Sequence, residues 1–153
     1  MKKIRLLLIL PLFGFTNLFL PTDTPHFTIS MTHYFGAAGY SKNYIVTADS
    51  IKLITNCDFE NCKPETLYKA KLTAEQSQDF YNFLITQRLD TLKEYYEVAG
   101  IDDGRQSEIK ISGDSLPDKT IYLSNYLHPV TETIFKRTDK LITKKKYRLY
   151  KDG

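Results

Sequence analysis

The order of strand-like and helix-like segments restricts the fold of this chain more than any other feature of the sequence. Phe27, Ile29 and Met31 alternate with polar residues, which is typical of a strand with one buried face. Five later stretches are predicted to be strands: residues 44–47, 51–55, 66–72, 108–111 and 120–123. The first two form a predicted hairpin with its turn at 48–50, and the last two form a second hairpin with its turn at 113–118.

The first helix is predicted to follow the strand at 66–72. Thr73 and Gln76 have the spacing of a capping box, in which each side chain satisfies the other residue's backbone N–H. Phe80, Phe83 and Leu84 then recur at intervals of three and four residues. We therefore expect a helix of about 15 residues that buries an aromatic stripe against the sheet.

A second helix is predicted to begin at His128–Pro129, because proline is favoured at the first helical position. Its apolar pattern continues to about Lys144, and Tyr147 and Leu149 suggest a short last strand. Strands, a helix, two strands and a helix predict a single α+β domain over residues 23–153. We expect a mainly antiparallel sheet with two helices packed on one face.

The N-terminus has the pattern of a signal peptide. Three basic residues within the first five positions precede an apolar stretch at 6–15, which is short for a membrane span. We expect residues 1–22 to be a leader whose cleavage position is open, because no Ala-x-Ala motif is present; the alternative is an uncleaved anchor. Cys57 is too far from the leader for a lipoprotein. The mature protein is expected to be periplasmic or extracellular, without a membrane span.

Charge is unevenly distributed along the chain. Removing the three basic residues of the leader leaves 18 Lys and Arg against 18 Asp and Glu, so nucleic-acid binding is not indicated. Residues 136–151 contain eight basic residues and one acidic residue. This basic end, with Lys144, Lys145, Lys146 and Arg148, is a candidate contact for anionic headgroups, lipopolysaccharide or an acidic envelope protein. The alternative is that these charges complement a helix C-terminus and keep the chain end soluble.

Cys57 and Cys62 are the only cysteines, separated by four residues in a polar turn. In an oxidising compartment they are expected to form a local structural disulfide; the alternative is two free thiols. His26, His33 and His128 have no spacing that would complete a zinc site with them. We therefore expect no metal and no cofactor.

No common catalytic motif is present in the sequence. His33, at the end of a strand and before a glycine-rich stretch, is the best single candidate for a polar site. With Asp102 or Asp103 it would define a small hydrolase or a metal-assisted enzyme. The simpler interpretation is a surface histidine and an Asp-Gly turn. Glu97 with these aspartates does not match a calcium-binding loop.

Tyrosine is abundant, with 11 Tyr and no Trp in the chain. Its stiff amphipathic side chain suits interaction surfaces, although half-buried sheet positions use it equally. Tyr34, Tyr40 and Tyr44 are candidate binding residues on the predicted sheet.

Several short segments carry a weak resemblance to a family: Tyr34–Gly36, Tyr44–Val46, the helix around Phe80–Leu84, Asp103–Gly104 and Asn125. Over residues 27–142 the chain resembles small exported bacterial domains of unknown function. The chain departs from that pattern where cysteines flank the Phe-Gly pair in the family, because Tyr34 and residues 37–39 stand there instead. The resemblance implies no activity.

Three functional hypotheses remain from the sequence. The first is a non-enzymatic exported module that binds a protein or another envelope component through its tyrosines or its basic end. The second is the small hydrolase or metal-assisted enzyme built on His33 with Asp102 or Asp103. The third is a structural accessory protein of the envelope.

Overall fold

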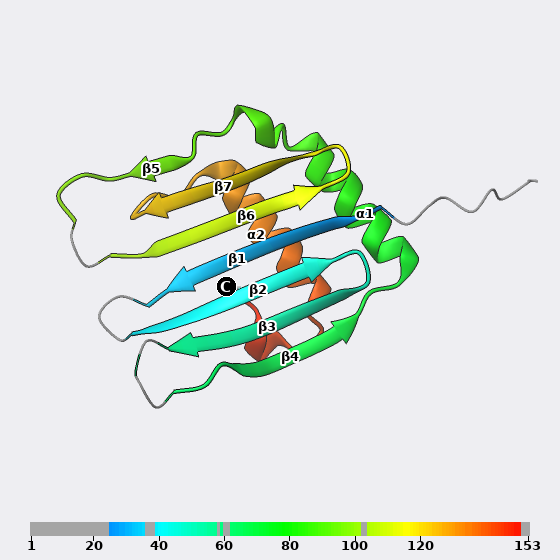
Figure 1. The fold of residues 1–153 in the computed structure, drawn as a ribbon, viewed down its shortest axis with the longest axis horizontal. Helices are drawn as coiled ribbons and strands as arrows, with labels where there is room; N and C mark the ends of the chain where they lie inside the picture. Colours follow the sequence, from blue (N-terminus) through cyan, green and yellow to red (C-terminus); the bar gives the residue numbers. More distant parts are fainter. Residues whose placement is uncertain (1–24, 36–38, 58, 60–61, 102–103, 151–153) are drawn as a thin grey trace, which may run out of the picture.

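The computed structural model describes residues 25–35, 39–57, 59, 62–101 and 104–150. In this part of the chain, seven strands form one sheet with the order β4-β3-β2-β1-β6-β7-β5 (Figure 1). The strands are β1 (Phe27–Tyr34), β2 (Tyr40–Thr47), β3 (Ser50–Cys57), β4 (Glu65–Lys71), β5 (Tyr95–Glu97), β6 (Gln106–Gly113) and β7 (Leu116–Ser124). Neighbouring strands are antiparallel, except that β5 runs parallel to β7. The predicted α+β class is confirmed.

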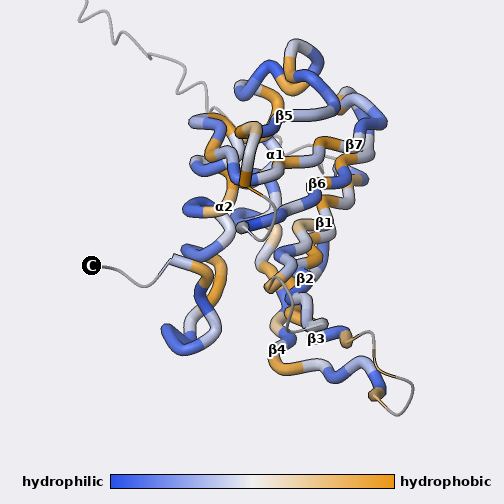
Figure 2. Tube along the Cα trace, turned by 90° about the vertical axis from the view of Figure 1, so that its left-hand side faces the viewer, coloured by the Kyte–Doolittle hydropathy of each residue, from blue (hydrophilic) through white to orange (hydrophobic). Residues whose placement is uncertain are grey.

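Both longer helices, α1 (Ala74–Thr86) and α2 (Pro129–Leu141), cover the same face of the sheet, as predicted (Figures 1 and 2). Two short 3₁₀ helices, η2 (Leu89–Thr91) and η3 (Lys145–Tyr147), follow α1 and α2 respectively. In Figure 2 the sheet is seen nearly edge-on, with no described segment on its other face.

The alternation in β1 determines which side chains face the helices. Ile29 and Met31 are fully buried, and Ile29 pairs with Val46 on β2 and Ile111 on β6. These apolar side chains form one row across the sheet, because residues directly opposite each other on paired strands share a face. β1 therefore lies at the centre of the core.

The capping box predicted for α1 is present. The Gln76 N–H donates to Thr73 Oγ1 at 3.1 Å, and the Thr73 N–H donates to Gln76 Oε1 at 3.0 Å. Phe80 and Leu84 are fully buried, and the ring of the partly buried Phe83 lies 6.1 Å from that of Phe80. The predicted aromatic stripe thus packs on the sheet.

The start of α2 is also as predicted, but its end is not. Helix α2 ends at Leu141 and not near Lys144, because Ile142 has extended backbone angles and a fully buried side chain. The predicted last strand at Tyr147 and Leu149 is wrong: η3 occupies this region. Residues 142–150, here called the C-terminal strap, fold back against the helix-covered side of the sheet.

Strand β5 was not predicted from the sequence. The N–H of Tyr122 donates to the carbonyl of Glu94 at 2.7 Å, and the rings of Tyr95 and Tyr122 stack at 5.5 Å. This short parallel strand extends the sheet beyond β7. Its three residues are too few to give a recognisable alternation in the sequence.

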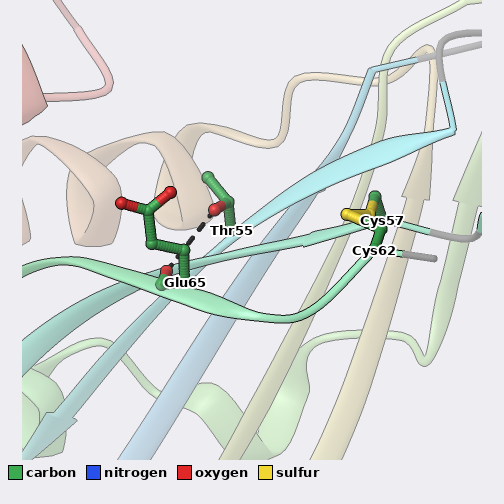
Figure 3. Close-up of a disulfide and its surroundings, with 4 residues drawn as sticks. All are labelled: Thr55, Cys57, Cys62 and Glu65. Atoms are coloured by element: carbon green, nitrogen blue, oxygen red, sulfur yellow. Dashed lines mark hydrogen bonds between the residues drawn. A yellow bond between two sulfur atoms is a disulfide. The ribbon is translucent and has the colours of Figure 1, made fainter.

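Cys57 and Cys62 form the predicted disulfide, which joins the end of β3 to the segment before β4 (Figure 3). Their Cα atoms are 6.0 Å apart, within the usual range for disulfides. Nearby, Thr55 Oγ1 donates to the carbonyl of Glu65 at 3.4 Å. The two interactions hold the end of β3 against the start of β4.

Among the residues described, no helix combines the length and the apolar character that crossing a membrane requires.

Candidate functional site

A pocket of about 640 Å³ lies at the end of the sheet where β1 finishes and β6 begins. This volume is within the range of roughly 300–1,000 Å³ that is usual for small-molecule sites. Three segments distant in the sequence line the pocket: His33, Tyr34 and Phe35; Gly104 and Arg105; and Leu149 and Tyr150 of the C-terminal strap.

His33 is the most unusual residue of this pocket. It is only 2% exposed, and it stands opposite Lys42 on β2 and Ser107 on β6. Its Nδ1 lies 2.7 Å from Ser107 Oγ, and its ring centroid lies 4.6 Å from that of Phe135. Its Nε2 is buried without a hydrogen-bond partner among the described residues. The interpretation of His33 as a surface histidine is therefore wrong, because β1 directs this side chain toward the helices.

The surroundings of His33 keep its imidazole neutral. The pKa of His33 is lowered from 6.5 to about 3, chiefly by burial and also by the positive charges of Arg105 and Lys42. At pH 7 the ring therefore carries one N–H and one lone pair on its two nitrogens.

Arg105 is placed at the pocket by Asn125, which follows β7. The N–H of Asn125 donates to the carbonyl of Arg105 at 2.8 Å, and its side-chain amide donates to the carbonyl of Ile101 at 2.9 Å. A Cβ atom at Gly104 would lie 1.4 Å from Asn125 Oδ1, so only glycine allows this close approach. These contacts of Asn125 fix the backbone at Arg105. The guanidinium of Arg105 lies over the ring of Tyr150, with its Cζ 5.6 Å from the ring centre.

Asp139 of α2 holds Leu149 and Tyr150, the part of the C-terminal strap that lines the pocket. Its carboxylate oxygens accept the N–H groups of Leu149 at 2.8 Å and Tyr150 at 2.7 Å. The hydroxyl of Tyr44 donates to the carbonyl of Tyr147 at 3.1 Å, which attaches the C-terminal strap to β2. Burial raises the pKa of Tyr44, and the charge of Asp139 raises it further.

The three candidate binding tyrosines do not form one surface. Tyr44 is buried and has the structural role just described, so its assignment to a binding surface is wrong. Tyr34 and Tyr40 are 37% and 51% exposed. Tyr34 pairs with Ser41, the neighbour of Tyr40, so Tyr34 and Tyr40 belong to opposite faces of the sheet. Of the three, only Tyr34 lines the pocket.

The candidate basic end is part of the folded domain up to Tyr150. Lys144, Lys145 and Lys146 are exposed, whereas Arg148 is partly buried and donates through Nε to the carbonyl of Ile142 at 3.0 Å. None of these four residues is among the described residues that line the pocket. Two basic residues are placed at the C-terminus of α2: Lys140 lies in its last turn, and Arg148 contacts its C-cap residue, Ile142.

The proposed pairing of His33 with Asp102 or Asp103 falls outside the described residues, because both aspartates do. Within the described ranges, no group of three or more His, Cys, Asp or Glu residues is placed to hold a metal ion. Ser107, the hydrogen-bond partner of His33, was missed in the sequence. It is 74 residues from His33, and only the register of β1 on β6 brings the two together.

Comparison with models of known protein families finds none that matches this chain, and comparison with curated proteins finds no similar sequence.

Proposed function

We propose that this protein is an exported, non-enzymatic binding module of the cell envelope whose ligand occupies the pocket at the β1–β6 end. The observation that carries this proposal is that His33 lines the pocket while its Nε2 is buried without a hydrogen-bond partner among the described residues. Buried polar atoms are almost always hydrogen-bonded, and an unsatisfied one costs about 1–3 kcal/mol. A ligand with a polar group at this wall would satisfy the imidazole and recover that cost.

Binding suits this site better than hydrolysis. The contact between Ser107 and His33 resembles a nucleophile and its base, and it is the one observation in favour of an enzyme. However, Ser107 is only 3% exposed and, unlike His33, is not among the described residues that line the pocket, so its hydroxyl is not presented to a ligand there. A histidine whose pKa is about 3 is also a weak general base at neutral pH.

Export is supported by two observations. The first 22 residues have the charge and hydropathy pattern of a leader, and Cys57 and Cys62 are paired, as expected in an oxidising compartment. The intact mass of the protein from its native cells, measured after alkylation, tests this part. Loss of the leader mass with no alkylated thiol supports export, and a full-length mass with two alkylated thiols overturns it.

The binding function can be tested with a tryptophan reporter, because the chain contains no Trp. Phe35→Trp places the reporter on the pocket wall, and Phe59→Trp is a matched control at another exposed phenylalanine outside the pocket. Both variants are titrated with the same set of small anionic, neutral and cationic aromatic compounds. Saturable changes in emission from the Phe35→Trp variant alone support the proposal.

Two results would overturn the proposal. If no compound changes the emission of the Phe35→Trp variant more than that of the control, the binding proposal is rejected in favour of a structural accessory protein. If Ser107 is labelled by a fluorophosphonate, the hydrolase replaces the binding module. Ser107→Ala is the control for that labelling.

A further inference from the structure

We infer that the pocket binds a small organic carboxylate with an apolar or aromatic body, held by Arg105 and by the Nε2–H of His33. This inference rests on the proposed function, and it specifies the chemical class of the ligand. Three features of the site lead to it: the sign of the charge, the arrangement of donors and the character of the walls.

The charge at the pocket is positive. Arg105 lines the pocket, and Lys42 stands opposite His33 with its Nζ 5.4 Å from the centre of the Phe35 ring. Neither cation forms an ion pair with a described residue. The nearby carboxylate of Asp139 is already engaged by two backbone N–H groups of the C-terminal strap. An anion in the pocket would therefore meet Arg105 in the wall, with Lys42 as a second cation beside it, and the single charge of Asp139 opposes them.

The donors are arranged for a planar anion. When the hydroxyl of Ser107 donates to Nδ1 of His33, the single N–H of the neutral imidazole is on Nε2, the atom that has no partner among the described residues. A guanidinium presents a planar fork that matches the two oxygens of a carboxylate. Together, Arg105 and His33 offer donors for a carboxylate; because a guanidinium also suits a phosphate, the choice between the two anions depends on the walls.

The walls suit an apolar body attached to that carboxylate. Phe35 is 46% exposed, and Leu149 and Tyr150 form the facing wall. Aromatic rings of a ligand stack favourably on such side chains. A free phosphate or a sugar acid would leave these surfaces in water, whereas an aryl or alkyl carboxylate would cover them.

The test uses three probes of the same shape: 3-phenylpropionate, 3-phenylpropanol and 3-phenylpropylamine. Each is titrated into the ¹⁵N-labelled purified protein, and the amide shifts of Phe35, Gly104, Arg105 and Tyr150 are followed together with the imidazole nitrogens of His33. We expect the carboxylate to bind at least about tenfold more tightly than the alcohol or the amine, as for a charge-assisted hydrogen bond. The free protein should show the proton on Nε2, and that signal should move on binding.

Arg105→Gln is the decisive variant, because the side chain is exposed and its loss leaves the core intact. It should reduce the affinity for the carboxylate to that for the alcohol. Lys69→Gln removes one positive charge from the far edge strand β4 and should leave all three affinities unchanged.

The outcomes separate the inference from the function on which it rests. Equal binding of the three probes, tighter binding of inorganic phosphate, no effect of Arg105→Gln, or a proton on Nδ1 of free His33 would overturn the ligand class and leave a binding pocket in place. If no probe shifts any pocket resonance, both the ligand class and the assignment of this pocket as the binding site are overturned.

Discussion

Acidification from pH 7 to pH 5 should destabilise the fold through His33 alone by about 2 kcal/mol. The pKa of this residue is about 3 in the folded protein, and its ordinary value of 6.5 applies to the unfolded chain. Between these values the unfolded chain binds a proton that the folded protein excludes, so the free energy of unfolding decreases as the pH falls. This destabilisation is small above pH 6.5 and grows as the pH falls toward the folded pKa.

The magnitude follows from the two pKa values. A pH of 5 is about 1.5 units below the pKa of the unfolded histidine, and each unit corresponds to about 1.4 kcal/mol in the free energy of unfolding. At pH 7 the corresponding contribution is only a few tenths of a kcal/mol. The folded imidazole stays neutral at both values of pH, because burial, Arg105 and Lys42 oppose its charge.

Urea unfolding at a series of pH values measures this effect. The carboxylates also titrate, so the informative quantity is the difference between the wild-type protein and His33→Asn, which cannot be protonated at this position. From pH 7 to pH 5 the variant should lose about 2 kcal/mol less than the wild type. His26→Asn, at an exposed histidine, should behave like the wild type.

The same pH dependence in the wild type and in the His33→Asn variant would refute the reasoning. It would mean that the imidazole is charged in the folded state, or that water reaches it.

Three further predictions concern the fold around the site. Thr73→Ala removes the capping box of α1 and should lower the free energy of unfolding by about 1 kcal/mol in urea titrations; no change would mean that solvent caps the helix equally well. Replacing Cys57 and Cys62 by serine should cost about 2 kcal/mol, as expected for closing so short a loop, and an unchanged melting curve would contradict this. Asp139→Ala leaves two N–H groups of the C-terminal strap without their acceptor, at a cost of about 2–3 kcal/mol. Trypsin should then cleave the exposed lysines at 144–146 faster than in the wild type, and an equal rate would show that the strap has other sufficient anchors.

Local patterns in the sequence predicted most of the fold. The alternation in β1 and the capping box before α1 involve neighbouring residues, so they can be recognised without knowledge of the rest of the molecule. The start of α2 at Pro129 was found for the same reason. Six of the seven strands described in the structure were predicted at least in part; β2 was predicted only in its second half, and β5 was missed.

The candidate site depends on contacts that no local pattern records. His33 was identified as a polar candidate, but its burial follows from the alternation of side chains along β1. Its contact with Ser107 follows from the register of β1 on β6. The C-terminal strap was missed because its polar sequence resembles a solvated tail. Its position is set by Asp139 and Tyr44, which contact it from α2 and β2.

The central place of β1 has a consequence for how the chain folds as it emerges, N-terminus first, from the ribosome. β1 pairs with β2, which follows closely in the sequence. Its other edge pairs with β6, which comes much later: Phe27 lies opposite Gly113. Until β6 has emerged, strands β1 to β4 can form only a partial sheet whose apolar row is bordered by an unpaired edge. Such an edge is a template for pairing with other chains, so chaperones should matter most in the interval before β6 is available.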